Sequence, residues 1–164
     1  MNKGNVIIDL DGTLADITHR LHYILEEPKQ WNRFHSDCKA DAPKDDIIAV
    51  VRALQLNGYT LHIITGRNAI SREITSAWLD WHEVPYHFLH MRKKNDRRHD
   101  VDVKLDIINN LELTPENTVC VLEDRAQVTR RGTVQLSAGH TQLAVFPVTP
   151  VIADRTLRCR IRPI

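Results

Sequence analysis

Apolar runs suited to buried strands alternate with segments of helical periodicity along most of this 164-residue chain. Strands joined through helices need crossover connections, which produce a parallel sheet covered by helices on both faces. The expected strands span 5–10, 59–65, 85–91, 118–123 and 141–146, and the expected helices span 43–58, 69–84 and 102–113. The alternation therefore predicts an α/β fold, a three-layer, Rossmann-like arrangement around a parallel five-stranded sheet.

Residues 15–42 form a longer connection than a strand and a helix normally need, and they contain helical pieces around 17–26 and 29–38. An insertion of this length at the active edge of a sheet is typical of a lid or cap. Its aromatic residues, Trp31 and Phe34, either stack on a nucleobase or pack within the cap. Trp78 and Trp81, in the helix expected at 69–84, better fit its core-facing side together with Ile70, Ile74 and Ala77.

Polar residues gather where three of the predicted strands end. Asp9 and Asp11 close the first strand, Thr65-Gly66-Arg67 follows the second, and Glu123-Asp124 ends the fourth. Ligands of open α/β sheets bind outside the carboxyl ends of the strands. Two acids this close either cap a helix or hold a cation, because like charges repel and burial of either is costly. Their coincidence with the other strand ends favours a catalytic site.

These residue types suit the cleavage of a phosphate ester. The Asp9 carboxylate can attack phosphorus to form an aspartyl-phosphate, while Asp11 protonates the leaving oxygen and later activates water. Thr65 and the backbone around Gly66 can hold a phosphate oxygen, and Lys104 can neutralise the negative charge of the nucleophile and of the transition state. Mg²⁺ binds few carboxylates and bridges to phosphate oxygens. Its expected ligands are Asp9, Asp11, Glu123 and Asp124.

The stretches DLDGT, IITGR and VLEDR, with the lysine at 104, resemble the four motifs of the haloacid dehalogenase superfamily, whose members are mostly phosphatases. Within it, the chain most resembles the 3′-phosphatase domain of phage-type polynucleotide kinases, through Arg20, Arg67 and DVDVK at 100–104. The resemblance implies a haloacid dehalogenase-like fold with a small helical cap after strand one. It also implies that Arg20, Arg67 and Lys104 contact the substrate phosphate and that Asp100 orients Lys104.

Three functions follow from these residues. The first is a Mg²⁺-dependent phosphomonoesterase that removes 3′-phosphates from nucleic-acid ends, which the resemblance suggests. The second keeps the chemistry but acts on a small molecule or mononucleotide, and the third is a non-catalytic nucleic-acid-binding module.

The basic run at 92–99 either holds a nucleic-acid backbone or is a solvated loop. No P-loop motif occurs, so a kinase or ligase acting on the same ends would be a separate partner.

The expected organisation is a phosphatase domain at 1–150, with its cap at about 15–42, and a basic tail at 151–164. Residues 128–138 interrupt helical periodicity around Gly132 and are expected to form a loop or a distorted helix.

No apolar run is long enough to predict a membrane span. Three isolated cysteines favour a reducing, cytoplasmic location. The net charge of +1 names no partner, and nothing in the sequence indicates an oligomeric state.

Overall fold

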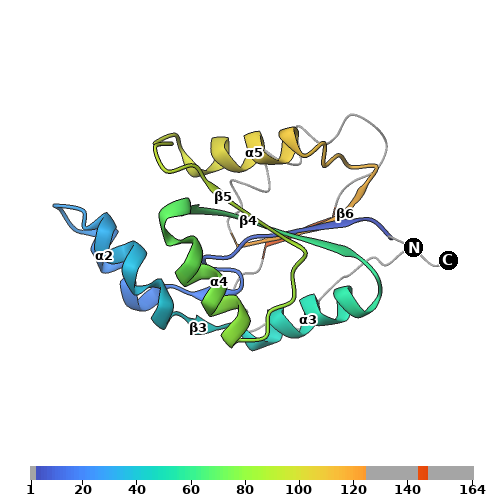
Figure 1. Ribbon diagram of the computed structural model, residues 1–164, viewed down its shortest axis with the longest axis horizontal. Coiled ribbons are helices and arrows are strands. Elements are labelled where there is room, and N and C mark those ends of the chain that lie inside the picture. The colour runs from blue at the N-terminus through green and yellow to red at the C-terminus, as the bar shows by residue number, and fades with distance from the viewer. Residues whose placement is uncertain (1–2, 125–143, 148–164) are drawn as a thin grey trace.

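A parallel β-sheet forms the centre of the structure (Figure 1). The computed structural model describes residues 3–124 and 144–147. Its strands are β1 (Asn5–Ile8), β4 (Thr60–Asn68), β5 (Phe88–Arg92), β6 (Thr118–Glu123) and β7 (Ala144–Pro147). They lie in the order β5-β4-β1-β6-β7, and neighbouring strands run parallel. The predicted parallel α/β architecture is confirmed. The segments predicted at 128–138 and 151–164 lie outside the described residues.

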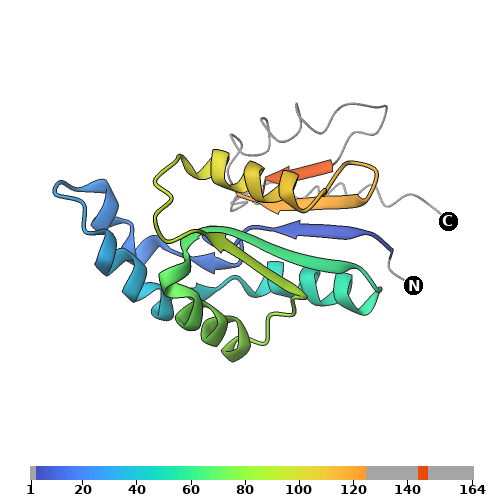
Figure 2. The same cartoon turned by 45° about the horizontal axis from the view of Figure 1, so that its top comes forward.

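Helices cover both faces of the sheet (Figures 1 and 2). On one face lie α3 (Asp45–Leu56) and α4 (Arg72–Trp81), the latter preceded by the 3-10 turn η3 (Ala69–Ser71); α5 (Asp100–Asn110) lies on the other. Side chains of β1 alternate between the two faces, as the pleat of a strand requires. Val6 and Ile8 join the core beneath α3 and α4, whereas Ile7 packs with Ile64 and with Ile108 of α5.

The buried side of α4 differs from the prediction. Thr75, Trp78 and Leu79 are buried, while Ile70 and Trp81 are 69% and 84% exposed. The expectation that Trp81 faces the core was therefore wrong. Thr75 of this helix points inwards instead, where its hydroxyl accepts a hydrogen bond from Arg67 at the sheet edge. With Thr75 on the buried side, the apolar side chains of Ile70 and Trp81 face solvent.

The chain between β1 and α3 folds as a series of short elements outside the sheet. They are β2 (Ala15–Asp16), η1 (Thr18–Arg20), α1 (His22–Leu25), α2 (Trp31–Ser36), η2 (Asp37–Ala40) and β3 (Ala42–Pro43). β2 and β3 pair antiparallel, so the segment leaves and returns at one place. Figure 1 shows α2 projecting beyond the end of the sheet at which the parallel strands finish. The segment therefore stands beside the edge where the sequence predicts a site.

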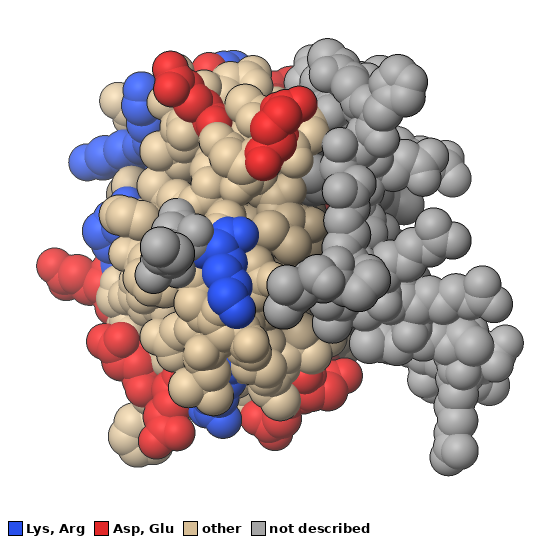
Figure 3. Space-filling model, turned by 90° about the vertical axis from the view of Figure 1, so that its right-hand side faces the viewer, with Lys and Arg blue, Asp and Glu red and all other residues tan. Residues whose placement is uncertain are grey.

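The opposite end of the molecule, where the strands begin, has a different character (Figure 3). Acidic side chains lie towards its upper and lower margins, and between them a few basic side chains stand on a described surface that is mostly uncharged. The predicted site residues belong to the carboxyl end of the sheet instead, the end at which open α/β sheets bind their ligands.

Candidate active site

The turn after β1 presents Asp9 at the sheet edge. The strand ends at Ile8, two residues earlier than predicted, because the carbonyl oxygen of Leu10 accepts hydrogen bonds from the backbone N–H groups of residues 13–15. Gly12 takes a φ of +92° in this turn, and a Cβ atom there would lie 2.0 Å from Oδ2 of Asp124. Only glycine allows this approach, which brings the ends of β1 and β6 together.

Lys104 forms the centre of a buried charge cluster. Its ammonium group donates to Oδ1 of Asp9 at 2.6 Å and to Oε2 of Glu123 at 2.7 Å, and lies 3.5 Å from Oδ2 of Asp100. The Lys104, Asp9 and Glu123 side chains are 2–3% exposed. β1, α5 and β6 thus deliver one cation and two carboxylates to a single buried point.

Thr13 links the two strand ends through its hydroxyl, a contact that the sequence analysis missed. The hydroxyl donates to Oδ2 of Asp9 at 3.2 Å and accepts from the backbone N–H of Asp124 at 3.1 Å. Both oxygens of the Asp9 carboxylate therefore have a donor, one from Lys104 and one from Thr13. The only sequence signal for this role is the position of Thr13 two residues after the acid pair.

Three carboxylates at this edge could hold a cation. Asp9, Glu123 and Asp124 each offer an oxygen, and these oxygens lie within 4.8 Å of one another. An all-carboxylate donor set is the kind that hard divalent cations such as Mg²⁺ prefer, so the residues present fit such an ion. Asp11, which was also expected to bind metal, is not part of this group.

Asp11 instead forms an ion pair with two arginines. Its Oδ1 accepts from Nη2 of Arg20 at 2.7 Å, and from Nε and Nη2 of Arg67 at 2.8 and 2.6 Å. Burial opposes ionisation of this carboxyl, but the charges of Arg67 and Arg20 outweigh it and hold the Asp11 pKa below its ordinary value. Asp11 is therefore a carboxylate in this arrangement.

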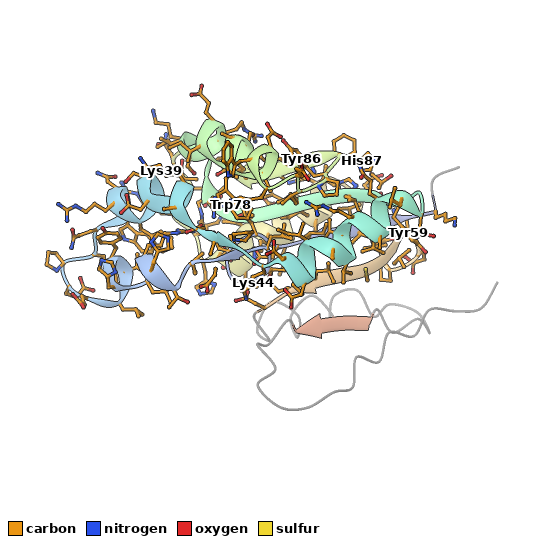
Figure 4. All side chains as sticks on the ribbon, turned by 90° about the horizontal axis from the view of Figure 1, so that it is seen from below. Lys39, Lys44, Tyr59, Trp78, Tyr86 and His87 are labelled. Carbon is orange, nitrogen blue, oxygen red and sulfur yellow. The ribbon has the colours of Figure 1, made fainter. Side chains whose placement is uncertain are left out.

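Asp41 is a further acid of this group, which sequence reasoning missed. It accepts from Nε and Nη2 of Arg20 at 2.6 Å each, and from Nη2 of Arg67 at 2.6 Å. Its backbone carbonyl accepts from the indole N–H of Trp78 at 2.8 Å, where α4 lies beside the segment that precedes α3 (Figure 4). Nothing local marks Asp41, because its partners are 21, 26 and 37 positions away.

Thr65 and Gly66 lie within β4, which continues to Asn68 rather than ending at residue 65 as predicted. The register with β5 shifts between Thr65 and Asn68, so the ladder is irregular where Arg67 turns to the site. The Thr65 hydroxyl accepts from the backbone N–H of Arg67 at 3.2 Å. A Cβ at Gly66 would lie 1.6 Å from Oδ1 of Asp100, so glycine admits this acid beside β4.

Comparison with known proteins identifies this arrangement. The family model described as the polynucleotide kinase PNKP phosphatase domain matches residues 3–132. The chain belongs to this family. A second model, an N-terminal domain of unknown function, matches residues 119–163, most of which lie outside the described part. Among curated protein sequences, none is significantly similar to this chain.

Solved structures place the phosphatase domain in the same fold. "Structure of Pnkp1/Rnl/Hen1 complex" contains a chain with 28% identity and a TM-score of 0.72, over 88% of this chain and 45% of that one. "Structure of the Pnkp1/Rnl/Hen1 RNA repair complex" gives 27% identity and 0.72, over 88% and 42%. This chain thus spans less than half of those proteins. A predicted phosphatase from Clostridium acetobutylicum shares the fold at 15% identity, TM-score 0.58, over 88% and 84%. The family is one of phosphatases with a haloacid dehalogenase-like fold.

The basic run at 92–99 is partly internal in this phosphatase domain. Arg92 donates to the carbonyl of Gly66 at 2.9 Å, and Arg98 donates to Oδ2 of Asp96 at 2.7 Å. Lys93, Lys94 and Arg97 are exposed. Arg92 and Arg98 thus make contacts within the loop, although Arg98 is also exposed. Asn68 of β4 holds the loop by donating to the carbonyl of Lys94 at 2.9 Å.

The aromatic residues of α2 have separate environments. Phe34 is buried, and its ring lies 4.2 Å from the guanidinium carbon of Arg20, so for Phe34 the packing alternative is confirmed. Trp31 is 50% exposed and its ring stacks with that of His35, 6.2 Å between centroids. Burial lowers the His35 pKa, against the charge of Asp11, which raises it. The ring of His35 also lies against that of Phe34, 5.8 Å between centroids.

Within residues 3–124 and 144–147, no helix combines the length and apolar content needed to cross a bilayer.

Proposed function

We propose that this phosphatase domain is a Mg²⁺-dependent phosphomonoesterase that removes 3′-phosphates from nucleic-acid ends through an aspartyl-phosphate at Asp9. The observation that carries the proposal is the buried Asp9 carboxylate held by Lys104 and Thr13 beside Glu123 and Asp124. A carboxylate fixed at both oxygens is oriented for attack, and the neighbouring lysine stabilises negative charge that develops on the transferred phosphoryl group.

The first chemical step forms a bond between an Asp9 oxygen and phosphorus and breaks the bond from phosphorus to the 3′ oxygen. Asp11, which takes up a proton from solvent once the substrate phosphate draws Arg20 and Arg67 away from it, gives that proton to the 3′ oxygen, which leaves as the 3′-hydroxyl end. Bound Mg²⁺, held by Asp9, Asp124 and Glu123, would neutralise charge on the phosphate oxygens. In the second step Asp11 takes a proton from water, whose oxygen attacks phosphorus, so inorganic phosphate leaves and Asp9 is restored. The arginine contacts that lower the Asp11 pKa also weaken it as a base, so we propose that both proton transfers take place once those contacts have passed to the substrate phosphate.

The remaining site residues would bind the phosphate. Arg20 and Arg67 would contact its oxygens, because both guanidinium groups lie at Asp11, beside the nucleophile. Thr65 and the backbone of Gly66 would complete the contacts, and Asp100 would orient Lys104 across the 3.5 Å that separates their charged atoms.

A nucleic-acid end is favoured over a small ester by two surfaces flanking the site. Lys93, Lys94 and Arg97 face solvent in the loop after β5, where they could follow a phosphate backbone. Trp31, half exposed on α2, offers a face on which a base can stack. The similar chain in the structure of an RNA repair complex supports a nucleic-acid substrate and suggests separate kinase or ligase partners.

We propose residues 1–150 as a cytoplasmic domain with five strands, 15–42 as its cap, and 151–164 as a basic tail.

Phosphate release from a 3′-phosphorylated oligonucleotide, with Mg²⁺ and with a chelator, tests the chemistry. Wild type should release phosphate only with Mg²⁺, and Asp9→Asn should release less than a thousandth as much, whereas Asp80→Asn, on exposed α4 surface, should match wild type. A stable Asp9→Asn protein that retains activity would refute the aspartyl-phosphate. Mg²⁺-dependent binding of the oligonucleotide without release in wild type would favour the binding-module alternative.

Substrate size is tested separately. Replacement of Lys93, Lys94 and Arg97 together by glutamine should raise KM for the oligonucleotide about tenfold or more at low salt and leave KM for a 3′-mononucleotide unchanged. An equal kcat/KM on the oligonucleotide and the mononucleotide in wild type would favour a mononucleotide phosphatase instead.

A further inference from the structure

Asp41 has contacts that differ in kind from those of the other site acids. Its two carboxylate oxygens accept hydrogen bonds from Nε and Nη2 of Arg20, which makes a bidentate pair. Oδ2 also accepts a hydrogen bond from Nη2 of Arg67. His19 lies 2.9 Å from Oδ1, and the indole N–H of Trp78 donates to the backbone carbonyl. One residue therefore gathers η1, β4 and α4 at the base of the segment 15–42.

The two acids that share these arginines differ in access. The Asp41 side chain is 0% exposed, whereas that of Asp11 is 18% exposed and belongs to the turn beside the nucleophile. Arg20 and Arg67 are themselves 0–1% exposed, so each needs a permanent partner for its charge. The contacts to Asp11 therefore lie nearer to solvent than those to Asp41, so we expect an incoming phosphate to replace the former and leave the latter in place.

We propose that Asp41 is the positioning residue of the phosphate site, which keeps Arg20 and Arg67 aimed at substrate while Asp11 is released for proton transfer. This inference rests on the proposed function. A bidentate pair fixes the plane of a guanidinium, so the Asp41 contacts determine where the Arg20 and Arg67 donors point when phosphate takes the place of Asp11. Without Asp41, both arginines would lose the buried carboxylate that fixes their directions, so their contacts to bound phosphate would weaken.

Asp41 also couples the segment 15–42 to the sheet. Arg20 lies at the end of η1, where the chain leaves for α1, and Asp41 lies immediately before β3, where it returns. Their bidentate pair closes the base of the segment, and the contact from Arg67 of β4 joins that base to the core. The placement of the cap and the aim of the arginines therefore depend on the same carboxylate.

The test measures KM and kcat on a 3′-phosphorylated oligonucleotide, and the inhibition constant of inorganic phosphate, for Asp41→Asn, Asp41→Glu and the exposed control Asp45→Asn. Asp41→Asn should raise KM and the phosphate inhibition constant about tenfold to a hundredfold, with a smaller fall in kcat, because ground-state phosphate contacts weaken. Asp41→Glu should restore part of both constants, and Asp45→Asn should match wild type. Circular dichroism reports whether each variant is folded.

A second variant covers failure of Asp41→Asn to fold. Trp78→Phe keeps the aromatic packing but removes the donor that holds the Asp41 backbone, and should raise the same two constants about threefold. Wild-type constants in a folded Asp41→Asn, or in Trp78→Phe if that protein alone folds, would overturn the proposal. A uniform loss of kcat with unchanged KM and inhibition constant would overturn it too, since this marks a purely structural role. Failure of the proposed function would appear separately, as a wild type without phosphate release.

Discussion

Replacement of Lys104 by methionine tests the central charge cluster most directly. Methionine keeps most of the unbranched side chain but removes the ammonium group that lies 2.6, 2.7 and 3.5 Å from the carboxylates of Asp9, Glu123 and Asp100. At an effective dielectric constant of about 20, each of these ion pairs represents about 5–6 kcal/mol of gross attraction. Most of this offsets the cost of taking the ammonium group out of water.

The net effect expected is a loss of about 3–5 kcal/mol in the free energy of unfolding, since a buried pair broken on one side leaves the partner charge uncompensated. For a domain of this size about 2–4 °C of melting temperature accompanies each kcal/mol, which gives a fall of roughly 6–20 °C. If Asp9 is the nucleophile as proposed, phosphate release should fall at least about a thousandfold, because Asp9 loses the Lys104 donor and the transition state loses a neighbouring positive charge.

Thermal melting in chelator and in Mg²⁺, beside phosphate release, measures both effects. Mg²⁺ should recover more melting temperature in Lys104→Met than in wild type, because the added cation replaces the lost positive charge. Lys39→Met is the matched control, an exposed lysine that should melt with wild type (Figure 4). If Lys104→Met melted within about 2 °C of wild type in chelator, the cluster would not stabilise the fold as reasoned here.

Three further expectations concern other contacts. Gly66→Ala should lower both the urea midpoint and kcat by forcing Asp100 away from β4, at a cost of about 1–3 kcal/mol, and unchanged kcat would contradict this. Thr13→Val should reduce kcat about tenfold to a hundredfold with little change in KM, because Asp9 loses one orienting donor, which steady-state kinetics would detect. Burial, then the charges of neighbouring histidines, lower the His62 pKa to about 4. The unfolded chain takes up this proton near pH 6.5 and the folded chain only near 4. The free energy of unfolding should therefore fall by up to about 3 kcal/mol as the pH is lowered from 6.5 to 4. Urea titrations of His62→Gln at several pH values should show a weaker dependence on pH than wild type.

The sequence predicted the sheet and the residues at its edge because both follow from local patterns. Apolar runs alternating with helical segments specify a parallel sheet, and the ends of its strands must then meet. Asp9, Asp11, Arg67 and Glu123 were therefore expected at one edge. The structure pairs Asp11 with Arg67 and brings Asp9 and Glu123 together at Lys104. Their chemical roles stay predictions until phosphate release is measured.

The contacts that the sequence did not predict are those fixed by packing between distant elements. Asp41 is bonded to residues 21 to 37 positions away, so no local pattern distinguishes it from a surface acid. The rotation of α4 was missed for the same reason, since Trp81 looks apolar in sequence and the tertiary position of Thr75 decides which side is buried. Asp11 was expected to bind metal because it lies two residues after Asp9. Its ion pairs with Arg20 and Arg67 depend on the tertiary structure, so no local pattern predicts them.

The segment 15–42 begins and ends within a single two-residue ladder, with Ala15 opposite Pro43 and Asp16 opposite Ala42. Because its ends are already joined, a longer segment would add little closure entropy, about 0.6 kcal/mol for each doubling of length. Segments of other lengths and compositions could therefore be exchanged at this point without disturbing the sheet, provided that the arginine and aspartate at the base are kept. The outer part of the segment can therefore vary in length and composition while the contacts between its base and the sheet stay the same.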